Sequence, residues 1–101
     1  MQGKVIVITV DGLERVMEYS RALNVEDLQQ AVAGYFRTVP FFEHYKGEPC
    51  VVMCNEEGER HNLPMNFKAS KHWFAQQALF STMLVGDVAV VQGDDEFMAA
   101  L

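Results

Sequence analysis

The chain has 101 residues, of which 50% are hydrophobic, and a formal net charge of −6 at pH 7. This length is typical of a single domain whose core is large enough to fold without a disulfide or a structural metal. The acidic balance argues against direct binding of nucleic acid, because phosphate contacts need clustered lysine and arginine side chains. It suits a basic partner instead.

The cysteines and the apolar runs indicate the compartment. Cys50 and Cys54 fall in one strand-like run, which places them on the same face of a strand but too far apart for a disulfide. We interpret them as reduced core thiols, which are typical of the cytoplasm. The apolar run over residues 5–8 is too short for a secretory leader, and no run approaches the roughly 18 residues of a membrane span.

The first part of the chain predicts a β-hairpin. Residues 4–10 are apolar and β-branched on both faces, as in a strand that is covered on two sides. Asp11-Gly12 predicts a two-residue turn with a positive φ at the glycine. Residues 13–19 then alternate, so they predict a second strand with one side in water.

A helix is expected after this hairpin. Asn24 is a typical N-cap residue, and Asp27, three positions later, favours the positive end of the helix dipole. Apolar residues recur at helical spacing over residues 25–33, and Gly34 is placed to end the helix.

The middle of the chain predicts two more strands. Residues 35–42 predict a strand that ends at Pro40 or lies on a sheet edge, because proline cannot donate to a ladder. A turn around Lys46-Gly47 leads to an apolar run over residues 50–54, which predicts a buried strand. A polar loop follows it.

The last third of the chain completes the pattern. Residues 69–81 predict a second helix, residues 85–91 a final strand bent at Gly86-Asp87, and residues 96–101 a short helix or frayed tail. The element order is therefore β-β-α-β-β-α-β, and the lack of strict strand–helix alternation indicates the α+β class. We expect one domain over all 101 residues, with a largely antiparallel sheet and the helices packed on one face.

One stretch of the sequence points to a family. It is an apolar strand followed by two motifs, Cys54-Asn55-Glu56-Glu57-Gly58 and Leu63-Pro64-Met65-Asn66. In these motifs, its opening strand and its late Gly-Asp step, the chain resembles an uncharacterised family of short bacteriophage and mobile-element proteins, known only as a domain of unknown function. The resemblance covers most of the chain. It implies a phage or plasmid origin and supplies no catalytic residues.

The loop after this strand holds the main candidate binding residues. Several of its positions have folding roles as turn, core plug or helix cap: Asn55, Gly58, Leu63, Pro64 and Asn66. We therefore expect the ends of the loop to be fixed and its middle to be free. The remaining residues are candidates to bind a partner, because loops on a rigid scaffold commonly carry binding residues: Glu56, Glu57, Glu59, Arg60 and His61.

Aromatic residues supply a second candidate surface. The chain has seven phenylalanines, which is many for a domain of this size, and cores take most aromatic side chains first. Phe41 and Phe42, beside Pro40, are the pair that we expect to be exposed and to bind a partner.

The cysteines, histidines and loop glutamates favour structural roles over catalysis or metal binding. Cys54 with His44, His61 or His72 could form a nucleophile–base pair, but a cysteine at the end of an apolar strand is typically buried and inert. The loop glutamates with His61 could bind a metal, but carboxylates in a flexible loop usually point into water. We predict no enzymatic activity, no metal and no cofactor.

These observations lead to one functional prediction and one alternative. We predict a small non-enzymatic binding protein that modulates a host protein in the host cytoplasm, for example as an anti-defence inhibitor that acts through its acidic surface. The alternative is a protein that binds or sequesters a small molecule or nucleotide, in a pocket lined by residues 55–66 and Trp73. An enzyme is the third interpretation, and the oligomeric state is left open.

Overall fold

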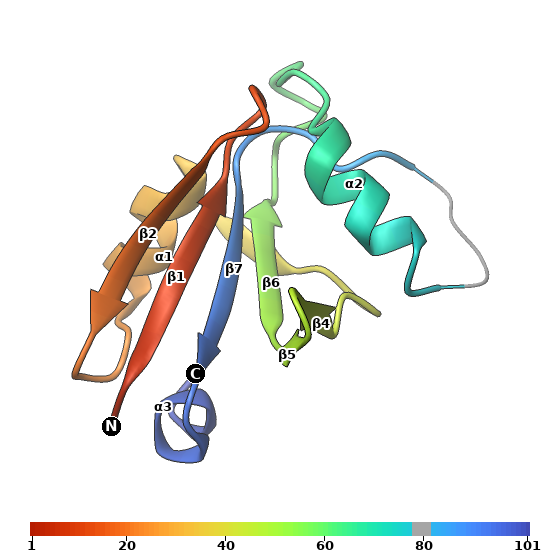
Figure 1. Ribbon diagram of the computed structural model, residues 1–101. Helices are drawn as coiled ribbons and strands as arrows, with labels where there is room; N and C mark the ends of the chain where they lie inside the picture. Colours follow the sequence, from red (N-terminus) through yellow and green to blue (C-terminus); the bar gives the residue numbers. More distant parts are fainter. Residues whose placement is uncertain (78–81) are drawn as a thin grey trace.

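The computed structural model describes residues 1–77 and 82–101, which form one α+β domain around a five-stranded sheet (Figure 1). The order across the sheet is β2 (Glu14–Tyr19), β1 (Gly3–Ile8), β7 (Val88–Gly93), β6 (Val51–Asn55) and β3 (Phe36–Thr38). All of these neighbours pair antiparallel. The remaining described elements are the β4 (His44–Tyr45)–β5 (Glu48–Pro49) hairpin and the helices α1 (Val25–Val32), α2 (Phe67–Phe74) and α3 (Asp95–Ala99). The predicted α+β class and antiparallel sheet are confirmed.

The sheet is covered on both faces. Along β1, Val5 and Val7 pack in a cluster with residues of α1 and α3, whereas Ile6 and Ile8 pack in a second cluster with residues of α2 and of the β4–β5 hairpin. The two-sided strand predicted from residues 4–10 is therefore confirmed. The expectation that all helices pack on one face is wrong, because a strand that is apolar on both faces needs cover on both.

The β1–β2 connection differs from the predicted two-residue turn. Thr9 N–H donates to the Leu13 carbonyl (2.9 Å), Gly12 N–H donates to the Thr9 carbonyl (2.9 Å), and Gly12 has φ 81°. This is a three-residue loop with a left-handed glycine, the next commonest hairpin form. The positive φ predicted at Gly12 is confirmed, whereas the loop length is wrong. The Thr9 hydroxyl also bonds to the backbone of Leu13 and stabilises the longer loop.

The two-residue turn with two positive φ angles occurs instead between β4 and β5. Lys46 has φ 52° and Gly47 has φ 79°, and Tyr45 pairs with Glu48 across the turn. These angles are those of the primed turn that matches the twist of a hairpin. The turn predicted around Lys46-Gly47 is thus confirmed and carries two short strands.

Helix α1 begins as predicted and ends one residue early. The Asn24 side chain accepts from Asp27 N–H, and the Asp27 carboxylate accepts from Asn24 N–H, both at 2.9 Å. At the other end, Gly34 N–H donates to the Gln29 carbonyl (2.9 Å) while Ala33 takes the left-handed conformation with φ 59°. The left-handed position of this C-terminal motif usually holds glycine, so here Ala33 occupies the position predicted for Gly34, and Gly34 follows it with φ 156°.

Helix α2 is organised by Asn66, a fully buried residue with 0% exposure. Its side-chain oxygen accepts from Ala69 N–H (3.0 Å), and its side-chain nitrogen donates to the carbonyls of Ile8 and Gly86 (2.9 Å each). The predicted helix cap is confirmed. The helix begins directly after it, two residues before the predicted start, and the predicted end at residue 81 lies outside the described residues.

The C-terminal segment contains the predicted short helix. Asp94 caps α3 by accepting from Phe97 N–H (2.9 Å), and it also accepts from Gln2 N–H (2.8 Å). Gly86 and Asp87 precede β7 and do not bend it, because β7 begins at Val88. The last strand of the chain lies at the centre of the sheet, so the sheet is complete only when this segment inserts between β1 and β6.

Two helix caps of the same residue type allow a matched prediction. Asn24→Ala should lower the free energy of unfolding by about 1 kcal/mol, the usual cost of an exposed cap. Asn66→Ala should cost about 2–4 kcal/mol, because it also leaves two buried carbonyls without a donor. Urea denaturation of both variants measures the difference. Equal losses would contradict the bridging role of Asn66.

A reciprocal pair tests the two left-handed positions. Gly12→Ala should destabilise by about 1 kcal/mol and Ala33→Gly should stabilise by about 0.5–1 kcal/mol, because only glycine adopts these angles without strain. A Cβ at Gly12 meets nothing within 4 Å, so the first effect comes from the backbone alone. Thermal unfolding should shift in opposite directions, and shifts of the same sign would refute the assignment.

Candidate functional site

The polar loop after β6 is wound into turns. Asn55 accepts from Glu57 N–H at its side-chain oxygen (2.8 Å), and its side-chain nitrogen donates to the Val32 carbonyl (3.1 Å). Within the loop, His61 N–H donates to the Glu57 carbonyl (3.0 Å) and Asn62 N–H to the Glu59 carbonyl (3.1 Å). The anchoring role predicted for Asn55 is confirmed. The expectation of a free middle is wrong, because these bonds satisfy the loop's own backbone.

The charged side chains of this loop remain at the surface. Glu56, Glu59, Arg60 and His61 are exposed, and the half-buried Glu57 lies 3.6 Å from Arg60 and 3.3 Å from His61. These exposed pairs contribute little to stability. The loop therefore presents exposed side chains of both signs, and its role in binding stays a prediction.

The turn predicted at Gly58 is confirmed, because residues 56–62 form turns and Gly58 N–H donates to the Asn55 carbonyl (3.3 Å). Gly58 is also buried, and a Cβ at this position would lie 2.7 Å from the Val85 side chain. Its φ is not among the positive ones, so close packing, and not a left-handed backbone, explains why the residue is glycine. Gly58 thus holds the loop against the segment that precedes β7.

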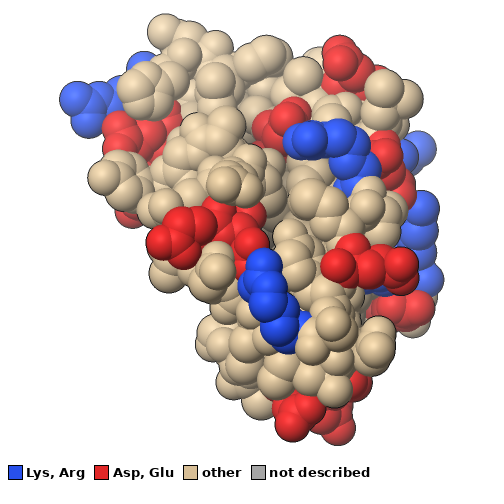
Figure 2. Space-filling model, turned by 90° about the vertical axis from the view of Figure 1, so that its left-hand side faces the viewer, with Lys and Arg blue, Asp and Glu red and all other residues tan. Residues whose placement is uncertain are grey.

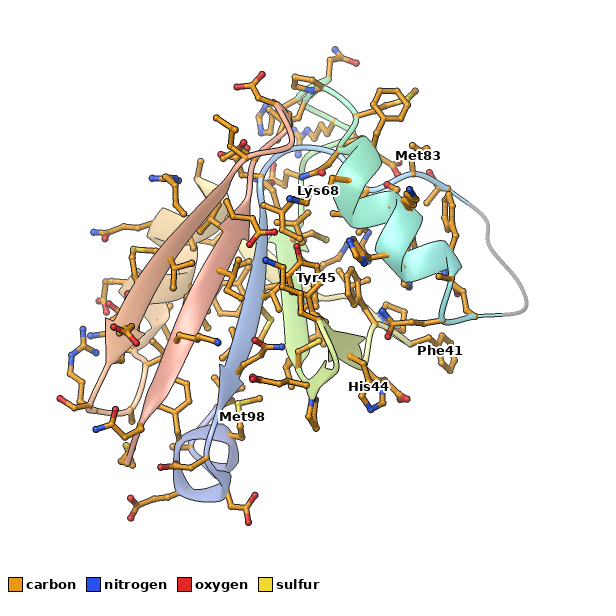
Figure 3. All side chains as sticks on the ribbon, viewed as in Figure 1. Phe41, His44, Tyr45, Lys68, Met83 and Met98 are labelled. Atoms are coloured by element: carbon orange, nitrogen blue, oxygen red, sulfur yellow. The ribbon has the colours of Figure 1, made fainter. Side chains whose placement is uncertain are left out.

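Phe41 and Phe42 are not an exposed pair. Phe41 is 66% exposed with φ 64°, whereas Phe42 is 2% exposed and belongs to the core cluster on the α2 side. The prediction of an exposed Phe42 is wrong, because adjacent residues point to opposite sides and one of them must fill the core. Phe41 lies beside the C-terminal end of α2 (Figure 3), whereas the polar loop leads to its N-terminal end. The predicted site residues therefore do not form one surface.

The pocket predicted beside the loop is small. A hollow of about 120 Å³ is lined by Arg37, Cys54, Asn55, Glu56, Glu59, Met83, Leu84 and Val85. Trp73 is buried elsewhere, with its indole N–H donating to the Pro40 carbonyl (2.7 Å). Burial raises the pKa of the Cys54 thiol, which disfavours the thiolate that a nucleophile needs. Within residues 1–77 and 82–101, no group of three or more potential metal ligands converges.

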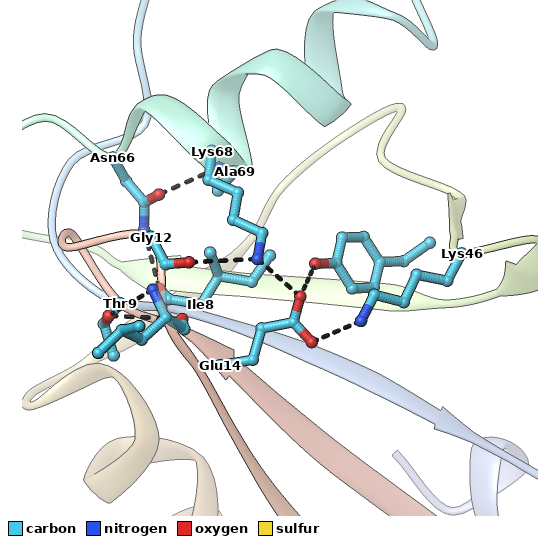
Figure 4. Close-up of polar contacts among 10 residues, drawn as sticks. Ile8, Thr9, Gly12, Glu14, Lys46, Asn66, Lys68 and Ala69 are labelled. Carbon is cyan, nitrogen blue, oxygen red and sulfur yellow. Dashed lines mark hydrogen bonds and ion pairs between the residues drawn. The ribbon is translucent and has the colours of Figure 1, made fainter.

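A cluster of charged groups that the sequence did not indicate lies on the α2 side of the sheet (Figure 4). The Glu14 carboxylate of β2 accepts from the Tyr45 hydroxyl (2.5 Å), the Lys46 ammonium (2.8 Å) and the Lys68 ammonium (2.9 Å). Lys68 also donates to the Gly12 carbonyl (3.2 Å). One carboxylate thus joins β2, the β4–β5 hairpin and α2.

The contacts in the cluster shift the pKa values of three of its side chains. Hydrogen bonds from Lys46 and Tyr45 lower the pKa of Glu14 to about 2. Burial, together with the bond to Glu14, raises the pKa of the Tyr45 hydroxyl. The His72 ring lies edge-on to Tyr45 at 4.8 Å, and burial followed by the charge of Lys68 lowers the pKa of His72. Sequence reasoning missed the cluster because Glu14 falls on the side of a strand that alternation assigns to solvent.

A groove opens at the end of the sheet where β1 begins and β7 ends. It encloses about 690 Å³ and is lined by residues of β1, β2, β5, β6, β7 and α3. Its charged lining consists of Glu18, Glu48, Asp95 and Lys4, and the Lys4 ammonium lies 3.9 Å from the Glu48 carboxylate. Three carboxylates against one ammonium make the groove acidic.

The outer edge of β2 is open. β2 is the first strand in the sheet order, and no described strand pairs with its far side. Thr9 N–H donates to the Leu13 carbonyl, and the residues bonded to the neighbouring strand alternate along an antiparallel pair. The N–H and C=O groups of Glu14, Val16 and Glu18 therefore point away from β1, toward solvent.

The side chains along this edge are exposed and partly apolar. Leu13, Val16 and Met17 are exposed, with 55% of Val16 accessible to solvent. Figure 2 looks at this side of the molecule and shows red and blue groups separated by uncharged surface. No single-sign charge field covers the face shown.

The Glu14 cluster predicts a specific loss of stability in acid. A lowered pKa stabilises the fold above the unfolded value of about 4.5, and this contribution is lost as pH falls toward about 2. Glu14→Gln should cost about 1–2 kcal/mol at pH 7 after solvent screening. The difference from wild type in urea denaturation should shrink between pH 5 and about pH 2. Glu18→Gln, on the same face of β2, is the control. A constant difference for Glu14→Gln would contradict the cluster.

Comparisons with known proteins place the chain in a family. Among the described residues, no helix has the length and apolar character needed to cross a membrane. No curated protein and no solved structure matches the chain. A family model described as "Domain of unknown function (DUF3846)" matches residues 1–100. Since this match spans nearly the whole sequence, the chain belongs to that uncharacterised family.

Proposed function

We propose that this domain is a non-enzymatic binding protein that engages a partner protein by adding an extended segment of the partner to the free edge of β2. The observation that carries the proposal is the outward-facing backbone of Glu14, Val16 and Glu18. In this mode of recognition, main-chain hydrogen bonds supply affinity and alternate side chains supply specificity.

The composition of β2 supports an edge that receives a strand. Natural edge strands are usually protected by proline, by charged side chains, lysine above all, by a bulge or by very short length, and the charged residues of β2 are Glu14, Arg15 and Glu18. β2 has six residues and contains neither proline nor lysine, and its six residues pair with β1 in continuous register. Its exposed Val16 and Met17 would be buried by an added strand, which would contribute hydrophobic stabilisation.

We further propose that the protein is of phage or mobile-element origin and that its partner is a host protein of the cytoplasm, in keeping with an anti-defence role. The support is the resemblance carried by the motifs at residues 54–58 and 63–66. The net charge of −6 favours a basic partner. On the face in Figure 2 both signs are interspersed, so on this face we assign recognition to the β2 edge and not to a broad acidic surface.

The polar loop is the second contact in this proposal. The loop and the β1–β2 hairpin lie at the same end of the sheet (Figure 1). A partner strand that continues past Glu14 would approach the exposed side chains of Glu56, Glu59, Arg60 and His61. The loop would then add specificity to an interaction whose affinity comes from the edge.

Val16→Pro tests this function. Proline at Val16 removes an outward N–H without removing a bond to β1, so the fold should remain intact. Wild type immobilised at low salt should retain a partner from a bacterial host lysate. The amount of this partner retained by Val16→Pro should be lower by a factor of about ten or more. Hydrogen exchange at Glu14, Val16 and Glu18 should slow in wild type when the purified partner binds.

Val16→Thr is the matched control, because it keeps the N–H group and the shape of the side chain. It should retain the partner within about threefold, and both variants should melt within a few degrees of wild type. Equal retention by wild type and by Val16→Pro would place the binding surface elsewhere, with Phe41 as the next residue to test.

A second candidate function is binding of a small molecule. The groove of about 690 Å³ falls within the usual size of ligand sites, roughly 300–1,000 Å³. Its three carboxylates disfavour a nucleotide and suit a cationic ligand. A thermal-shift screen with polyamines and nucleotides separates these two ligand classes. A melting temperature that rises with polyamines alone would favour this second function.

A further inference from the structure

We propose that the segment received by β2 carries a basic side chain opposite Glu18 and apolar side chains opposite Met17 and Val16. The inference rests on the proposed function and specifies the chemistry of the partner. It follows from the register of β2, the position of the acidic groove and the exposure of two apolar residues.

The register determines which side chains meet. Directly opposite residues of an antiparallel pair share a face of the sheet. Glu18 and Val16 lie on the α2 side, because they pair with Lys4 and Ile6 of β1. Met17 lies on the α1 side, because it pairs with Val5. Three consecutive partner residues would therefore face Glu18, Met17 and Val16 in turn.

Glu18 is where the open edge meets the groove. It belongs to β2 and also lines the groove, together with Glu48, Asp95 and Lys4. Lys4 lies 3.9 Å from the Glu48 carboxylate, so the groove keeps an excess of negative charge. A lysine or arginine opposite Glu18 is long enough to extend from the edge into this groove and to bury its aliphatic stem there.

The apolar positions follow from exposure. Val16 is 55% and Met17 36% exposed, and they face opposite sides of the sheet. An added strand with apolar residues opposite both would cover them on the two faces at once. Glu14 requires no partner cation, because Lys46 and Lys68 already bind its carboxylate at 2.8 and 2.9 Å. The position opposite Glu18 is therefore the one at which the partner needs a basic side chain.

A second copy of this chain fits the edge poorly. A two-fold pairing centred on Val16 would place Glu14 of one copy against Glu18 of the other, and because Lys46 and Lys68 already bind Glu14, this pairing would give Glu18 no cation. A pairing centred on Met17 would place Val16 of one copy against Glu18 of the other. Each copy also carries a net charge of −6, so a basic segment of another protein is the better occupant.

The test uses a display library of random octapeptides on a neutral carrier, selected on wild type with Val16→Pro as background. Enriched peptides should contain a lysine or arginine next to two apolar residues, with the basic residue about fivefold above its frequency in the unselected library. Selection on Glu18→Lys should replace this basic residue by an acidic one. Glu26→Lys, an equal charge change on α1, should leave the preference unchanged.

The outcomes separate this inference from the proposed function. One outcome is that the selected peptides bind wild type and not Val16→Pro, but lack the basic residue or are selected equally on Glu18→Lys. This outcome would overturn the inference and leave edge binding intact. Peptides that reproduce β2 itself, together with a dimer in sedimentation, would assign the edge to a second copy and also overturn it. No enrichment above Val16→Pro would overturn it as well, and loss of the lysate partner on Val16→Pro would still support the proposed function.

Discussion

The side chain of Asn66 joins three segments that are far apart in the sequence. Its oxygen caps α2 at Ala69, and its nitrogen donates to the carbonyl of Ile8 at the end of β1 and to that of Gly86 before β7. Its own N–H donates to the Leu84 carbonyl (2.8 Å). Because the residue is fully buried, water cannot replace these bonds. The start of α2 is therefore tied to the first and last strands of the sheet.

The position of α2 in turn determines how the β4–β5 hairpin docks. Lys68, in the first turn of α2, reaches Glu14 on β2, and Glu14 accepts from Tyr45 of the hairpin. On its other side the hairpin is bound by Gln92 of β7, whose amide donates to the carbonyls of Tyr45 (2.8 Å) and Glu48 (3.3 Å). The hairpin is fixed at both sides and forms one wall of the acidic groove. The candidate surfaces at β2 thus depend on contacts made by α2 and β7.

Local chemistry in the sequence predicted the elements, and tertiary contacts decided the rest. The cap at Asn66 and the positive φ at Gly12 follow from residue type alone. The loop length beside Gly12 was predicted wrongly although its cause is also local, since Thr9 bonds to the backbone of Leu13 four residues later. Phe42, in contrast, is buried because the core needed one of two adjacent rings. Glu14 could not be found from its strand pattern: its three partners come from β4–β5 and α2, far away in the sequence. The charged loop after β6 was predicted from the sequence. The open edge of β2 was not, because it depends on the strand order, which the sequence did not predict.

The two edges of the sheet differ in a way that bears on binding. β3 has three residues and is followed by Pro40, after which Phe41 takes φ 64° and turns the chain away. A proline and a left-handed residue at this point shorten the edge and prevent a long ladder. β2, with six residues, has no such block. Its protection is electrostatic, since Glu18 and the net charge of −6 repel a second copy. This repulsion does not act against a strand of opposite charge. The negative charge that keeps β2 from pairing with β2 of a second copy therefore also favours a basic partner strand.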